Sequence, residues 1–158
     1  MPNKDIQKTK LVPKKRYIIF SLFFGLSILL LIALYKGGHQ LDSITVNGNK
    51  IFIEKLTSEK DKEKGLSGSK FLPSNQGMLF VYDTSGNWKI WMKDMNFSID
   101  VIWLDDTARV VGIKEGLSPE SYPEIFQIEQ NSKYILELNS GAVKKYGIKM
   151  GDIFQDIQ

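Results

Sequence analysis

Cysteine is absent from the 158 residues, and histidine occurs once, at position 39. The lack of cysteine excludes disulfide frameworks, thiolate zinc sites, cysteine nucleophiles and a lipid-modified N-terminal cysteine. The single histidine excludes a histidine-rich metal cluster and leaves only His39 for a serine protease-like triad. No nucleophile elbow, Walker loop, dinucleotide fingerprint or zinc-protease helix motif occurs. The sequence therefore offers no catalytic template, and we expect neither a cofactor nor a bound metal.

Charge is unevenly distributed along the chain. The first 16 residues carry six basic residues and one acid, whereas residues 36–158 carry 15 basic and 17 acidic residues. A basic tail thus offsets a mildly acidic body. Because nucleic-acid-binding domains are typically basic, we expect no nucleic-acid partner.

Residues 17–35 form a run of nineteen residues without a charge. As a helix this run spans about 28 Å, which nearly matches a hydrocarbon core of about 30 Å. Basic residues 14–16 precede it, and Tyr17 and Tyr35 occupy the interfacial positions. A cleaved signal peptide is the alternative, but no small-x-small cleavage site follows Leu34. The sequence therefore predicts a basic cytoplasmic tail (1–16), an uncleaved transmembrane helix (17–35) and an extracytoplasmic C-terminal part.

The region beyond the membrane segment divides into a polar linker, 36–43, and a domain, 44–158, long enough to bury a core. Its apolar runs are short, rich in β-branched and aromatic residues, and separated by turn-forming residues. These runs predict strands at 44–46, 51–56, 77–82, 87–93, 99–104, 109–114, 133–138 and 153–154. Short helices are expected at 58–64, where Ser58 and Asp61 form a capping box, and at 140–146. The pattern predicts a mainly β fold, a small antiparallel β-sandwich or barrel with one or two short helices.

Six short motifs in this region occur in an order and spacing that resemble a known family. They are Lys64-Gly65-Leu66, Gly77-Met78-Leu79-Phe80, Trp91-Met92-Lys93, IDVIWL at 99–104, YILEL at 134–138, and Gly147-Ile148 before Gly151-Asp152. Over roughly residues 51–154 the chain resembles the uncharacterised bacterial and archaeal family named domain of unknown function 192. The resemblance implies a mainly β domain, often secreted or membrane-tethered, and it implies no activity.

Three charged residues interrupt the most apolar predicted strands: Lys93, Asp100 and Glu137. By alternation, Asp100 shares a face with Ile102 and Leu104. If these charges point inward, they must pair or shift their pKa values. One hypothesis is a ligand site in which Lys93 binds an anionic or hydroxyl-bearing group, and Asp100 and Glu137 accept the protons or hydroxyls of that group. A structural ion pair and plain surface exposure are the alternatives.

Tryptophans lie close to these charges in the sequence. Trp91 and Trp103 belong to neighbouring predicted strands. Aromatic faces beside polar groups are typical of sugar binding, whereas core packing is their commoner role. We therefore include both in the candidate ligand site.

Placement, fold class and the lack of catalytic templates favour a membrane-anchored extracytoplasmic binding or interaction module. Its expected ligand is an envelope glycan, peptide or protein. One alternative is an envelope hydrolase or transferase that uses carboxylates or Lys93. Another is a structural partner of a second membrane protein.

The predicted topology has a direct test. A protease added to intact spheroplasts should digest residues 44–158, because the positive-inside bias places the basic tail in the cytoplasm. Immunoblotting against the C-terminal domain measures the digestion, and lysed spheroplasts supply the control for intrinsic protease sensitivity. Protection of the domain in intact spheroplasts would contradict this topology.

Overall fold

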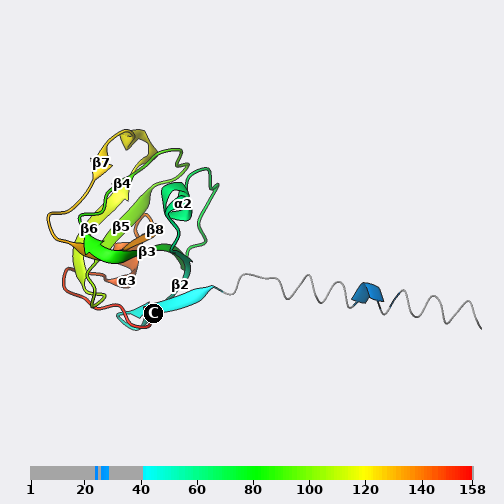
Figure 1. The fold of residues 1–158 in the computed structure, drawn as a ribbon. Coiled ribbons are helices and arrows are strands. Elements are labelled where there is room, and N and C mark those ends of the chain that lie inside the picture. The colour runs from blue at the N-terminus through cyan, green and yellow to red at the C-terminus, as the bar shows by residue number, and fades with distance from the viewer. Residues whose placement is uncertain (1–23, 25, 29–40, 158) are drawn as a thin grey trace, which may run out of the picture. The chain divides into compact units, whose positions relative to one another are not determined.

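The structure is a computed structural model, and it describes residues 24, 26–28 and 41–157 (Figure 1). Residues 41–157 form one compact unit. Most of the predicted membrane segment, 17–35, lies outside the described residues; positions 24 and 26–28 are helical. Within the described part of the chain, no helix is both long and apolar enough to cross a membrane.

The C-terminal unit is built on a six-stranded sheet with the order β1-β2-β3-β8-β5-β6 (Figure 1). Its strands are β1 (Asp42–Val46), β2 (Asn49–Leu56), β3 (Gln76–Gly86), β5 (Ile99–Leu104), β6 (Val110–Leu117) and β8 (Ser132–Asn139). A second, two-stranded sheet pairs β4 (Ile90–Trp91) with β7 (Ile125–Phe126). The helical elements are α2 (Glu59–Lys64), the 3-10 turn η1 (Pro119–Ser121) and α3 (Ala142–Tyr146). The expectation of a mainly β fold with few short helices is confirmed.

The expectation of an entirely antiparallel arrangement is wrong, because β2 and β3 pair in parallel. Parallel neighbours require a crossover connection of a dozen or more residues. Residues 57–75 provide it and include α2, whose N-cap Ser58 accepts a hydrogen bond from the Asp61 amide at 3.1 Å. The crossover therefore places α2 beside the main sheet.

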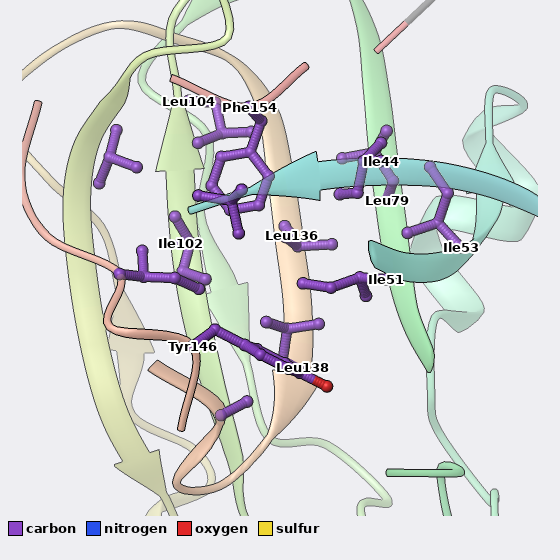
Figure 2. Packing of buried hydrophobic residues seen from close by; sticks show 14 of the residues in the cluster. Ile44, Ile51, Ile53, Leu79, Ile102, Leu104, Leu136, Leu138, Tyr146 and Phe154 are labelled. Carbon is purple, nitrogen blue, oxygen red and sulfur yellow. The ribbon is translucent and has the colours of Figure 1, made fainter. Parts of the chain in front are cut away.

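Both faces of the main sheet are covered by apolar side chains. We call them the α3 face, with Ile102, Leu136 and Leu138, and the α2 face, with Val101 and Trp103 among others. Figure 2 shows the α3 face, where side chains from β1, β2, β3, β5 and β8 pack against Tyr146 and Phe154. All six residues of β5 are buried, which explains its nearly continuous apolar sequence.

Two predicted strands differ from the structure. The run 87–93 is strand only at β4, because it pairs with the two-residue β7 rather than with the main sheet. The C-terminal run is not a strand but a segment with isolated bridges from Gln155 to Thr45 and from Ile153 to Arg109. This segment thereby contacts both β1 and the start of β6, the two edges of the main sheet.

Gly112 of β6 permits a close approach of the loop that follows β7. A Cβ atom at Gly112 would lie 2.6 Å from Cγ2 and 2.9 Å from Cδ1 of Ile128. Ile128 packs on the α2 face, so this contact attaches the β7 region to the main sheet.

Gly112→Ala should therefore destabilise the fold by about 1–3 kcal/mol through overpacking. Ile128→Ala in the same chain should recover part of that loss, because it removes the atoms that clash. Urea unfolding of the two single variants and the double variant measures the coupling. Strictly additive losses in the free energy of unfolding would show that the contact with Ile128 is not the reason why a side chain at position 112 is unfavourable.

Candidate functional site

The α2 face of the main sheet carries a small cavity of about 60 Å³ between α2, β3, β8 and β4. Its lining combines apolar side chains with several charged ones. The lining residues are Lys62, Glu63, Lys64, Gly65, Leu66, Ser67, Phe80, Tyr82, Lys89, Ile90, Trp91, Met95 and Glu137. We call this space the inner cavity.

Glu137 is the acidic group on the sheet side of the inner cavity. It lies on β8 between Met78 of β3 and Val101 of β5, and it is 5% exposed. Its carboxyl group forms no hydrogen bond or ion pair with any residue that the structure describes. Burial raises the pKa of Glu137 from 4.5 to about 8, so the carboxyl group holds its proton at neutral pH.

Lys62 of α2 is the buried base of the same cavity, with a side chain only 6% exposed. Its Nζ donates to the Val81 carbonyl at 3.2 Å and pairs with Glu59 at 2.6 Å. The ammonium also lies 4.6 Å from the centre of the Tyr82 ring. These contacts hold a positive charge at the cavity without using Glu137.

Tyr82 of β3 also lines the inner cavity. Burial, then the charges of Glu137 and Glu59, raise the pKa of Tyr82 to about 12. The ring stacks on Trp88 with centroids 4.0 Å apart. Tyr82 therefore remains a neutral hydroxyl that can donate or accept a hydrogen bond.

Trp91 marks the mouth of the site. It lines the inner cavity and two wider hollows of about 220 and 250 Å³. Trp91 is 44% exposed, with its ring 6.2 Å from that of Tyr122 in an edge-on arrangement. The Nζ of Lys93 lies 5.5 Å from the centre of the Trp91 ring. We call the inner cavity and the two hollows together the cleft.

The five predicted site residues are thus divided between different places. Glu137 and Trp91 line the inner cavity, and exposed Lys93 lines one of the outer hollows. Asp100 and Trp103 do not line the cleft.

Asp100 lies on the opposite face of the sheet and is completely buried. One carboxylate oxygen accepts from the Gly116 amide at 2.9 Å, and the other from the Val143 amide at 2.9 Å. Val143 is in the first turn of α3, where backbone amides lack helical partners. Asp100 therefore connects β5, β6 and α3.

Trp103 is buried within the α2 face, and its indole donates to the Trp88 carbonyl at 3.3 Å.

Sequence reasoning missed Lys62, Tyr82 and Lys89 as cleft residues. The run 58–64 has the composition of a solvated helix face, so nothing in it distinguishes Lys62. The signal that was available is the i, i+3 pairing of Glu59 with Lys62, which holds this lysine along the helix.

Within residues 41–157, His, Asp and Glu side chains nowhere gather in a group of three that could hold a metal ion. The cleft lining supplies lysine ammonium groups, a protonated carboxyl group and aromatic rings.

The fold and the site define a small mixed-sheet domain with a lysine-rich cleft over a buried acid. The chain belongs to the DUF192 family, described as uncharacterized ACR, whose model matches residues 43–155. The resemblance found in the sequence is thereby confirmed. The chain matches none of the curated proteins with which it was compared.

Two solved structures share the fold. One is a protein of Sinorhizobium meliloti described as a candidate transcription regulator, with a TM-score of 0.67 and 26% identity over 73% of this chain and 90% of that one. The other is a protein of unknown function from Novosphingobium aromaticivorans, with a TM-score of 0.69 and 24% identity over 75% and 87% of the two chains. Their similarity supports the mixed-sheet architecture.

The raised pKa of Glu137 predicts a pH-dependent stability. Between about pH 4.5 and 8 the unfolded chain releases this proton and the folded chain retains it. The neutral carboxyl group therefore makes its full contribution to the free energy of unfolding below about pH 4.5. This contribution declines as the pH rises from 4.5 to about 8. Glu137→Gln should remove this decline. Its free energy of unfolding should therefore rise by roughly 4 kcal/mol relative to that of the wild type between pH 4.5 and pH 8.

Urea unfolding at pH 5, 6.5 and 8 measures this difference. Glu54→Gln is the matched control, because Glu54 is exposed on β2 and should leave the slope unchanged. Equal pH slopes for the wild type and Glu137→Gln would contradict a proton held by Glu137.

Proposed function

We propose that this chain is a single-pass membrane protein whose extracytoplasmic domain binds an envelope glycan in the cleft. Residues 17–35 supply the anchor, and residues 44–158 supply the binding domain. The observation that carries the proposal is the exposed ring of Trp91 at the mouth of a cleft lined by lysines.

The arrangement suits a sugar for two physical reasons. Trp91 presents a partly exposed aromatic ring on which a pyranose ring can stack, and the Lys93 ammonium, which lies over this ring 5.5 Å from its centre, can donate a hydrogen bond. The inner cavity, which Trp91 also lines, adds polar groups of Lys62, Tyr82 and Glu137. Apolar walls with a few convergent polar groups are typical of small-ligand sites.

The Sinorhizobium relative is described as a candidate transcription regulator. We propose no nucleic-acid partner for this chain, because residues 36–158 are net acidic and the predicted topology places them outside the cytoplasm.

The glycan hypothesis is tested with the full-length chain in detergent micelles. Thermal shift and calorimetry against envelope oligosaccharides, peptides and nucleotides should show dose-dependent stabilisation by glycans only. Trp91→Ala should weaken glycan binding at least tenfold, since stacking is lost, whereas Phe71→Ala should not. Phe71 is the matched control because it is a 72% exposed aromatic residue that is not part of the cleft lining. No stabilisation by any glycan would reject the proposal.

A second candidate is an envelope hydrolase that uses Glu137 as its general acid. The observation that favours it is the pKa of about 8, which keeps this carboxyl group protonated at neutral pH. Asp100, the other buried carboxylate, is on the opposite face and satisfied by backbone amides. Product analysis after incubation with the bound glycan separates the two: turnover lost in folded Glu137→Gln supports the hydrolase, and binding without turnover supports the module.

A further inference from the structure

We propose that the inner cavity receives an oxyanion of the ligand, a carboxylate or phosphate group, bound by the ammonium of Lys62 and by a hydrogen bond donated from Glu137. This inference deepens the proposed function and rests on it for the identity of the ligand as a glycan.

The first reason is the unused hydrogen-bonding capacity of Glu137. A buried polar group without a partner is costly, and native structures usually satisfy it. Here the carboxyl group borders a cavity of about 60 Å³, which has room for a small polar group or ordered water. A ligand group that enters this space would supply the missing partner.

The second reason is the sign of the charge around the cleft. Its lining contains five lysines, Lys60, Lys62, Lys64, Lys89 and Lys93, against the acids Glu63, Asp94 and Glu137. The region after residue 35 as a whole carries more acids than bases, so this positive lining is a local feature. The Lys62 ammonium is already paired with exposed Glu59 at 2.6 Å, so an oxyanion in the inner cavity would be a second anionic partner for it, whereas a ligand ammonium would be repelled.

Proton retention by Glu137 makes the carboxyl group a donor. An ionised carboxylate accepts hydrogen bonds only, and it would repel an oxyanion. The ionisable groups that border the inner cavity with Glu137 come from α2, β3 and the approach to β4: Lys62, Glu63, Lys64, Tyr82 and Lys89. Tyr82 stays neutral to about pH 12, so it adds a second uncharged donor.

Binding should therefore weaken as Glu137 loses its proton. With a pKa of about 8, the affinity for an acidic ligand should fall about tenfold between pH 7 and pH 9. Glu137→Gln, which keeps an N–H donor and cannot ionise, should bind with little change over this range. Lys62→Met should bind at least tenfold more weakly at every pH.

The experiment titrates the full-length chain in detergent with sugars that differ in one group. N-acetylglucosamine is the neutral probe, N-acetylmuramic acid adds a carboxylate, and N-acetylglucosamine 6-phosphate adds a phosphate. At pH 7 at least one acidic sugar should bind about tenfold or more tightly than the neutral one, and which of them does so identifies the source of the oxyanion. Glu63→Gln is the matched control, because it changes an acid of the same lining and should keep the wild-type pH dependence.

Acetate and inorganic phosphate, compared with chloride at equal ionic strength, test the cavity without a sugar. If these ions stabilise the wild type but not Lys62→Met, while no sugar binds, the oxyanion site stands and the glycan proposal fails. If the neutral sugar binds as tightly as both acidic sugars, the oxyanion inference fails while glycan binding stands. Identical pH profiles for Glu137→Gln and the wild type, or no effect of either ion or acidic sugar, would also overturn it.

Discussion

Burial of the main sheet on both faces is the constraint on which the rest of the structure depends. A carboxyl group on its central strands must be satisfied by hydrogen bonds or keep its proton. Asp100 follows the first course, since amides of Gly116 and Val143 each donate to it at 2.9 Å. Glu137, on the neighbouring strand and the other face, has no such partner among the described residues and its pKa rises to about 8. One acid thus organises the fold, and the other is left chemically available.

The parallel pairing of β2 with β3 determines where that available acid meets a base. The crossover between these strands carries α2 to the same face of the sheet as Glu137, and the Ser58 cap fixes where the helix begins. Lys62 then reaches the Val81 carbonyl and covers the Tyr82 ring. A hairpin at this point would have left the α2 face without Lys60, Lys62 and Lys64. The topology of two strands therefore determines the composition of the cleft.

Local patterns predicted most strands because alternation and turn residues act over a few positions. Strand 99–104 and the helix cap at Ser58 are reproduced closely for that reason. The parallel pair and the short β4–β7 sheet were missed because both depend on partners distant in sequence. Within the candidate site, Glu137 stood out as a charge in an apolar strand. Lys62 did not, because its burial arises only when α2 packs beside β3, and Asp100 resembled Glu137 until the faces were assigned.

The C-terminal segment joins the two edges of the main sheet. The Gln155 amide and carbonyl pair with Thr45 of β1 at 2.8 and 3.1 Å, and the Phe154 amide donates to Ala108, just before β6, at 3.0 Å. An uncovered edge strand is a template on which another chain can add. Because a few terminal residues occupy part of both edges, they restrict sheet-to-sheet polymerisation between neighbouring copies. These contacts leave fewer free backbone N–H and C=O groups on the two edge strands for pairing with another chain.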